Sequence, residues 1–198
     1  MKKNDVYESI LEIAKEISKE KKGGLFIIAP RGKLKGTYQN LYAQIISKDA
    51  MIDEKGISEV IKNLSLLDGA VIITDRGNLF SYGAMVKKLR PIRGFGTKHA
   101  AAAGFTGSVK NSTAILIEEK KDWIKVFKNG RIVLEMDSGN CTTSTKTKIV
   151  KFLAEDDAAL LTTAGLSAAV LGLAPILVIG GAYLVIKTAT GIIKKNIR

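Results

Sequence analysis

The sequence predicts an α/β fold, a mixed central β-sheet flanked by helices, on three observations. Short apolar runs bounded by turn residues recur along the chain, as is typical of strands buried on both faces. Amphipathic segments with apolar residues on one helical face lie between them. Glycine-containing turns join neighbouring apolar runs, as in β-hairpins. The predicted buried strands are Leu25–Ala29, Ala70–Thr74 and Thr113–Ile117.

Two segments have the spacing of amphipathic helices. Residues 5–20 place apolar side chains at i, i+4, i+7, i+8 and i+11, with lysine and glutamate on the other face. We expect this segment to be a helix that simply covers the sheet. Residues 58–67 gather apolar residues on one side and lead directly to Asp68.

Two turns predict hairpins. Asp75-Arg76-Gly77-Asn78 follows the Ala70–Thr74 run, and Leu79–Tyr82 is its expected partner strand. Lys128-Asn129-Gly130 separates Trp123–Phe127 from Arg131–Glu135. Asn-Gly between alternating apolar residues is a strong hairpin signal.

Composition limits the classes of function. The chain has one cysteine, Cys141, and one histidine, His99, so it can form neither an intrachain disulfide nor a structural zinc site from these residues. The net charge is +12, and every acidic residue lies at or before Asp157. A basic surface suits polyanions such as nucleotides or anionic lipids. Nucleic acid is not expected, because aromatic residues make up only 6% of the chain and do not interleave with a basic stripe.

The stretch Arg93-Gly94-Phe95-Gly96-Thr97-Lys98-His99 is the first candidate functional site. Two glycines favour a turn, Thr97 occupies an N-cap position, and the alanines Ala100–Ala103 continue as strong helix formers up to Gly104. The start of such a helix presents unpaired backbone N–H groups, and Lys98 and His99 stand at the same end. This arrangement favours an anion site, most often a phosphate site. The alternative is a glycine turn that caps a surface helix.

A second motif, Asp68-Gly69-Ala70, opens an apolar run and begins 29 residues before Thr97. In order and spacing, residues 24–137 resemble the diadenylate cyclase domain, which makes cyclic di-AMP from two ATP molecules. That family carries Asp-Gly-Ala at the mouth of a strand, Gly-Thr-Arg-His-Arg at a loop-to-helix start, and an apolar strand that ends near Ser-Glu-Glu. The stretches that carry the resemblance are Leu67–Ile73, Gly96–His99 and Ala114–Glu119.

The resemblance implies a nucleotidyltransferase domain over residues 1–140. Such a domain condenses two ATP into cyclic di-AMP and two pyrophosphates at a face-to-face homodimer interface. It also implies a divalent metal, Mg²⁺ or Mn²⁺, that neutralises charge on the α-phosphate.

The resemblance also suggests roles for individual residues. Asp68 is the expected metal ligand or hydroxyl activator, and Gly69, followed by Ala70, would let the backbone approach the nucleotide. The remaining expected roles are the triphosphate site for Gly96, Thr97, Lys98 and His99, the adenine vicinity for Met85, and a second metal ligand for Glu118. Three of these assignments have a plain alternative: a turn aspartate at Asp68, simple packing at Met85, and a strand-end charge pair at Glu118.

The sequence departs from the family pattern at three positions. Lys98 and Ala100 stand where the family has arginines, and Ile117 stands where it has serine. Lysine keeps the charge but loses the bidentate fork of arginine. Two other functions therefore stay open: a sensor that binds ATP or cyclic di-AMP with weakened turnover, and a non-enzymatic interaction protein anchored to a membrane. The candidates to replace the lost arginine are Lys33, Arg90 and Arg93.

The C-terminal part is predicted to be a membrane anchor. Residues 141–157 read as a linker, and Ala158–Ile186 form a run of 29 residues without a charge. This run is long enough for one helical span of a bilayer and too short for two. A buried helix or an oligomer seam is the alternative. Residues 187–198 would be a basic tail, and the domain is placed in the cytoplasm, where ATP is, as a tail-anchored protein.

Overall fold

The structure is a computed structural model that describes residues 1–46, 50–119, 122–139, 143–154, 176–180 and 183–187. In these residues, nine strands form one sheet in the order β2-β4-β3-β1-β5-β6-β7-β8-β9. The strands are β1 Gly24–Ala29, β2 Tyr38–Asn40, β3 Ala70–Thr74, β4 Leu79–Val86, β5 Thr113–Ile117, β6 Trp123–Lys128, β7 Arg131–Asp137, β8 Ile176–Gly180 and β9 Tyr183–Lys187. The helices are α1 Lys3–Lys19, α2 Ile57–Leu64, α3 Thr97–Ser108 and α4 Thr143–Ala154, with a 3-10 turn at Arg31–Lys33.

The sheet is mixed, as predicted. Strand β1 pairs with β3 in parallel and with β5 in antiparallel orientation. The two predicted hairpins are confirmed as β3–β4 and β6–β7. Gly77 (φ 90°) lies in the first turn, and Asn129 (φ 51°) and Gly130 (φ 75°) form the second. Two successive residues with positive φ are what a tight hairpin turn requires, which explains the Asn-Gly pair.

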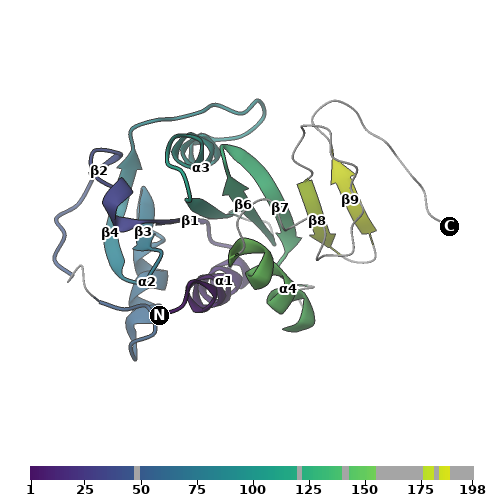
Figure 1. Ribbon diagram of the computed structural model, residues 1–198, viewed down its shortest axis with the longest axis horizontal. Coiled ribbons are helices and arrows are strands. Elements are labelled where there is room, and N and C mark those ends of the chain that lie inside the picture. The colour runs from purple at the N-terminus through teal and green to yellow at the C-terminus, as the bar shows by residue number, and fades with distance from the viewer. Residues whose placement is uncertain (47–49, 120–121, 140–142, 155–175, 181–182, 188–198) are drawn as a thin grey trace.

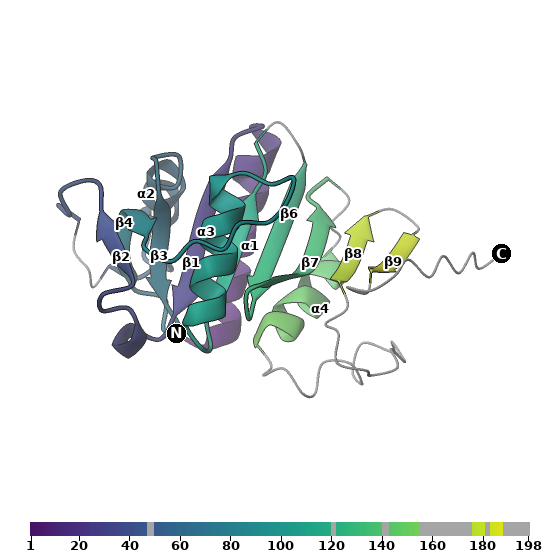
Figure 2. The ribbon, with the colours of Figure 1, turned by 90° about the horizontal axis from the view of Figure 1, so that it is seen from above.

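Helices cover both faces of the sheet. Figure 1 shows α3 on one face and α1, α2 and α4 on the other, and Figure 2 shows the same arrangement from above. The strands are apolar on both faces, and their side chains alternate between two cores. In β1, Phe26 and Ile28 belong to the core under α1, whereas Leu25 and Ile27 belong to the core under α3.

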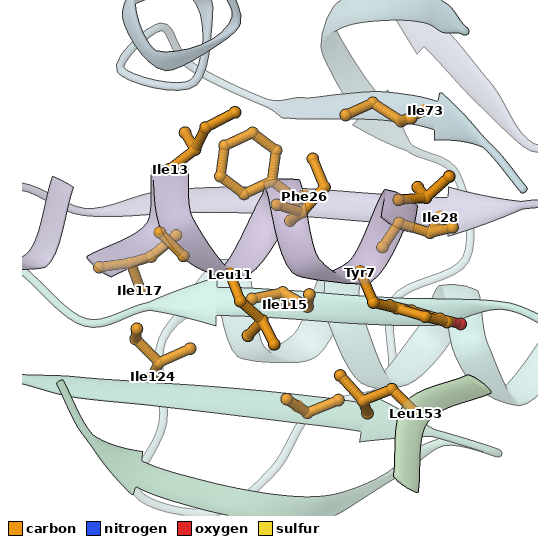
Figure 3. Close-up of a cluster of buried hydrophobic side chains, with 14 of the residues drawn as sticks. Tyr7, Leu11, Ile13, Phe26, Ile28, Ile73, Ile115, Ile117, Ile124 and Leu153 are labelled. Carbon is orange, nitrogen blue, oxygen red and sulfur yellow. The ribbon is translucent and has the colours of Figure 1, made fainter. Parts of the chain in front are cut away.

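The predicted amphipathic helix of residues 5–20 is confirmed as α1, and its apolar stripe lies on the sheet. Val6, Ile10 and Ile17 are fully buried. Figure 3 shows Tyr7, Leu11 and Ile13 of α1 packed over side chains of β1, β3, β5 and β6. Burying an aliphatic side chain of this size is worth about 1.5–3 kcal/mol, so this stripe alone explains why α1 is held against the sheet.

Helix α3 lies close to the other face because its side chains are small. Ala102 and Ala103 are fully buried, and Phe105 is 1% exposed. The connection from β4 to α3, residues 87–96, lies against this helix: the Arg90 N–H donates to the carbonyl oxygen of Ala100 at 2.9 Å. At Gly104, a Cβ atom would lie 2.0 Å from the carbonyl oxygen of Lys88. Glycine is therefore needed here for close backbone approach, in the interior of a helix that otherwise favours alanine.

The predicted linker of residues 141–157 is wrong over most of its length, because Thr143–Ala154 form helix α4. The composition of residues 137–148 suggested a linker, but the next residues bring an apolar face to the helix. Ile149 is 2% exposed, Val150 7% and Leu153 0%, all in the core under α1. Lys146 adds ion pairs with Glu8 and Glu12 of α1. The sheet also continues beyond residue 140 through β8, which pairs with β7 in parallel.

A membrane helix was predicted over residues 158–186, but the second half of this range forms strands and not a helix. Ile176–Gly180 and Tyr183–Lys187 form β8 and β9, an antiparallel pair. Aliphatic runs rich in β-branched residues, separated by a Gly-Gly pair, favour a hairpin over a helix. Residues 158–175, 181–182 and 188–198 of the predicted anchor and basic tail lie outside the described residues. The helices that the structure describes include none with the length and apolarity needed to cross a bilayer.

Candidate nucleotide site

The two sequence motifs meet at one edge of the sheet, which we call the site edge. Asp68 and Gly69 directly precede β3, and Ala70 pairs with Ala84 near the end of β4. Strand β5 ends at the same edge, because Ile117 pairs with Gly24 at the start of β1. Strands β3 and β5 are separated by β1 alone, which corresponds to about 10 Å of sheet width. Helix α3 begins there too, since His99 lies against Glu118, the residue after β5.

The glycine of Asp68-Gly69-Ala70 is fixed by backbone contact. Gly69 has a φ of 94°, and a Cβ atom there would lie 2.6 Å from the carbonyl carbon of Gly83. Gly83 in turn has a φ of 55°, and the ring of Tyr42 fills the place where its side chain would be. Both positions need glycine for conformation and for space. The motif therefore shapes the contact between the start of β3 and the last part of β4, and the backbone there leaves Asp68 at the surface.

Asp68 is suited to bind a metal together with a nucleotide. Its side chain is exposed, and among the described residues its carboxylate makes no hydrogen bond or ion pair. The described residues include no group of three histidine, cysteine or acidic side chains that could hold an ion by themselves. Mg²⁺ commonly binds through one or two carboxylates plus substrate phosphates, and a lone exposed Asp68 fits that mode.

The start of α3 presents backbone donors, although its cap differs from the prediction. The N-cap is Gly96, in an extended conformation, rather than Thr97, and no side chain caps the helix. Thr97 is the first helical residue and is exposed, and Lys98 is half-buried. No acidic residue lies in the first turn. Backbone N–H groups without a capping side chain, the helix dipole and a lysine all favour a bound anion.

A charged cluster is buried beside this helix start. It consists of Phe95, His99, Glu118, Lys125 and Glu135, and we call it the Lys125 cluster. The Lys125 Nζ lies 3.2 Å from Oε1 of Glu118 and 3.4 Å from Oε1 of Glu135, and its side chain is only 8% exposed. The His99 Nε2 lies 3.3 Å from the same Glu118 oxygen. Phe95 lies over both side chains, with its ring centroid 4.4 Å from Nζ of Lys125 and 4.5 Å from the centroid of the His99 ring.

The surroundings of His99 disfavour its charged form. Burial lowers the pKa of its imidazole, and the nearby Lys125 ammonium lowers this pKa further, while Glu118 acts in the opposite direction. Its Nε2 is buried without a hydrogen-bond partner among the described residues. The ring is therefore neutral at pH 7, and Lys98 supplies the charge at this end of α3.

The lowered pKa of His99 gives a pH dependence of stability. Since the unfolded chain takes up this proton near pH 6.5 and the folded chain only at lower pH, the contribution of His99 is complete above pH 6.5. It is lost as the pH falls below 6.5 toward the folded pKa. We expect His99→Gln to lose less unfolding free energy than the wild type between pH 7.5 and 5.5, as measured by chemical denaturation. Parallel pH profiles of the two proteins would contradict the shifted pKa.

The three residues considered as replacements for the lost arginine lie in different places. Lys33 follows β1 at the edge opposite the site, where its Nζ donates to the carbonyl oxygen of Lys110. The Arg90 guanidinium is directed toward the carbonyl oxygen of Gly130, in the hairpin turn at that same far edge. Arg93 alone of these three stays near the start of α3, where it is exposed. Met85 lies beside the motif on β4, paired with Gln39, and is 49% exposed.

Sequence reasoning missed Lys125. The signal was present, because strand β6 reads Trp-Ile-Lys-Val-Phe and its lysine occupies an inward position of a strand buried on both faces. A charged residue buried in such a strand is costly unless it is paired, so this lysine predicts carboxylate partners close by. Glu118, proposed as a second metal ligand, is one of them and is already balanced by Lys125.

An α/β sheet with a glycine-shaped strand start, an exposed carboxylate and an uncapped helix start is the arrangement that we expect of a nucleotide-binding domain. The family comparison agrees: residues 12–132 match the model of the DAC domain, described as the DisA bacterial checkpoint controller nucleotide-binding domain. The chain belongs to this family.

The chain is 30% identical over 139 residues to a diadenylate cyclase of Haloferax volcanii, covering 67% of this chain and 51% of the relative. A diadenylate cyclase of Methanocaldococcus jannaschii is 29% identical over 149 residues, covering 69% and 47%. The matched region therefore spans about half the length of these curated relatives.

Solved structures share the fold. A hypothetical membrane spanning protein from Bacillus cereus aligns with a TM-score of 0.51 at 18% identity, over 62% of this chain and 59% of that one. A double mutant of DacA from Staphylococcus aureus aligns with a TM-score of 0.50 at 16% identity, over 65% and 84%. At these identities the likeness concerns the α/β architecture alone.

Proposed function

We propose that this chain is a diadenylate cyclase, which joins two ATP molecules into cyclic di-AMP. The observation that carries the proposal is that the exposed Asp68 and the uncapped start of α3 lie at the same edge of the sheet. In the reaction, the 3′-hydroxyl oxygen of one ATP bonds to the α-phosphorus of the other, and the bond to pyrophosphate breaks. The hydroxyl proton is released, and two such steps close the ring and free two pyrophosphates.

The chain's own residues position the nucleotide. The backbone N–H groups of the first turn of α3, with Thr97 and Lys98, hold the triphosphate. Asp68 would hold a Mg²⁺ or Mn²⁺ ion, which neutralises charge on the α-phosphate, and it can accept the proton of the attacking hydroxyl. The close packing of Gly69 on Gly83 fixes the backbone beside Asp68, and Met85 offers an exposed apolar side chain for the adenine.

The ring of cyclic di-AMP contains two new phosphodiester bonds, one from each ATP. The site of one chain holds only one triphosphate, at the start of α3. A second copy of the chain, facing the first, brings the other ATP. Homodimer formation is therefore part of the proposal, and it makes the rate depend on the square of the protein concentration when the dimer is weak.

The decisive experiment is to incubate the full chain with ATP and either Mg²⁺ or Mn²⁺ and to measure cyclic di-AMP and pyrophosphate. Product in a ratio of one cyclic di-AMP to two pyrophosphates is expected. ATP binding without product would favour a sensor, in keeping with Lys98, Ala100 and Ile117. If ATP does not bind, both nucleotide functions fail and a non-enzymatic interaction protein remains.

Membrane attachment stays a prediction of the sequence, based on the uncharged run Ala158–Ile186. Because Ile176–Gly180 and Tyr183–Lys187 lie in the sheet, we propose that only the first part of this run, residues 158–175, holds the protein at a membrane, with the nucleotide site on the cytoplasmic side. In cell fractionation, the full chain should then pellet with membranes and resist carbonate extraction. Release of the full chain by carbonate would contradict an embedded segment.

A further inference from the structure

The start of α3 lacks the cation that the family places at position 100, because Ala100 stands there and is largely buried. Ala100 is 9% exposed, and its carbonyl oxygen accepts the backbone N–H of Arg90. A compensating positive charge must therefore reach the helix start from another direction.

Lys125 reaches it from the sheet. Its ammonium and the His99 ring contact the same oxygen of Glu118, at 3.2 and 3.3 Å. The side chains of Lys125, Glu118 and His99 are 8%, 11% and 12% exposed. Buried charges are retained only where paired groups compensate for lost hydration, so this arrangement is held in a defined geometry.

The same ammonium also anchors the turn before the helix. Phe95 stands between Gly94 (φ 84°) and Gly96, two residues that leave the backbone free to move. Its ring is 40% exposed, yet its centroid lies 4.4 Å from Nζ of Lys125. A cation under an aromatic face is attractive, and the attraction grows when the cation is withdrawn from water. Lys125 thus fixes the exposed turn as well as the buried ring.

We propose that Lys125 is the positioning residue of the nucleotide site: it holds Glu118, and through it His99, and it holds Phe95, so that the start of α3 is ordered for the triphosphate. The inference deepens the proposed function and relies on α3 as the phosphate site. It gives Lys125 a positioning role at this end of α3, whereas Lys33, Arg90 and Arg93 were considered from the sequence as replacements for the lost arginine.

The test compares five variants of the full chain with the wild type. Lys125→Met removes the ammonium and keeps the volume, and Lys125→Arg keeps the charge. The double variant Lys125→Met/Glu135→Gln removes one charge of each sign, which preserves the net charge if Lys125→Met alone fails to fold. Glu135→Gln leaves the contacts of Lys125 with Glu118 and Phe95 in place. Lys110→Met, at an exposed lysine beyond the far end of α3, is the matched control.

Two readouts follow the proposal. Because His99 is the only histidine, its Hε1 proton gives one assignable NMR resonance, and the nearby Phe95 ring shifts it. In nucleotide-free protein, the two Lys125→Met variants should move this resonance further than Glu135→Gln does, and Lys110→Met should leave it unchanged. With ATP, the KM should rise about tenfold in the Lys125→Met variants with kcat largely kept, because binding in ground and transition state is weakened alike. Lys125→Arg should stay close to the wild-type KM.

A folded Lys125→Met or double variant with an unmoved His99 resonance and a wild-type KM would overturn the proposal. So would an unchanged KM accompanied by lower kcat, which would indicate an effect confined to the transition state and not on the positioning of bound ATP. If the wild type makes no cyclic di-AMP, the cyclase proposal fails by itself. The inference is then decided by the His99 resonance and by ATP affinity, measured through the fluorescence of Trp123, the only tryptophan, at the start of β6.

Discussion

Asp68→Asn is expected to reduce cyclic di-AMP formation by at least about 100-fold while leaving ATP binding nearly unchanged. The substitution preserves the size of the side chain and removes the exposed carboxylate of the motif that leads into β3. Loss of the charge removes a metal ligand and a proton acceptor, both of which act on the reacting atoms. The triphosphate is held mainly by the start of α3, so affinity should persist. Product formation and ATP binding are measured on the same preparation.

The matched control is Asp75→Asn. Asp75 follows the same strand at the opposite edge of the sheet, where its backbone N–H donates to the carbonyl oxygen of Ala29. This variant should keep wild-type activity. A nearly normal rate for Asp68→Asn, or an equal loss in both variants, would mean that Asp68 has only a structural role in its turn.

Gly104→Ala is expected to lower the free energy of unfolding by about 1–3 kcal/mol. Helix propensity alone predicts the reverse, because alanine in a helix interior is favoured over glycine by about 1 kcal/mol. The structure decides against propensity, since the new Cβ would lie 2.0 Å from the carbonyl oxygen of Lys88 and 2.9 Å from the backbone nitrogen of Arg90. Residues 87–96 would have to shift away from α3. Thermal and chemical denaturation of the full chain measure the change.

Gly107→Ala in the same helix provides the comparison. Its Cβ would lie 3.3 Å from the Cα of Gly130, a contact that a small adjustment relieves. This variant should match or exceed wild-type stability. Stabilisation of both variants would show that residues 87–96 do not pack against Gly104.

The sequence by itself determined the elements and the place of the motifs along them. Buried strands were visible as uninterrupted apolar runs, because a strand covered on both faces has no polar side. The helix of α1 followed from its apolar stripe, and the β6–β7 hairpin followed from Asn129-Gly130, whose positive φ values few other residues tolerate. These features depend on residues close together in the chain, and local chemistry is sufficient to predict them.

The prediction failed where distant segments decide the outcome. Composition indicated a linker at residues 141–157, but packing of Ile149 and Leu153 against the core under α1 makes Thr143–Ala154 a helix. In the apolar C-terminal run, hydrophobicity indicated a helix, whereas the described part continues the sheet as β8 and β9. Burial of the same apolar side chains is available to a helix in lipid and to a strand at a sheet edge, and hydrophobicity does not choose between them.

The candidate site divides in the same way. Asp68, Gly69 and the stretch Gly96–His99 were recognisable from the sequence, and their roles stay predictions. Only the tertiary structure shows that Arg90 is directed to the far edge and that Lys125 lies against Glu118 and Phe95. The register of three adjacent strands and the docking of α3 set these distances. Coulombic and cation–π attraction depend on separation in space, which spacing along the chain does not determine.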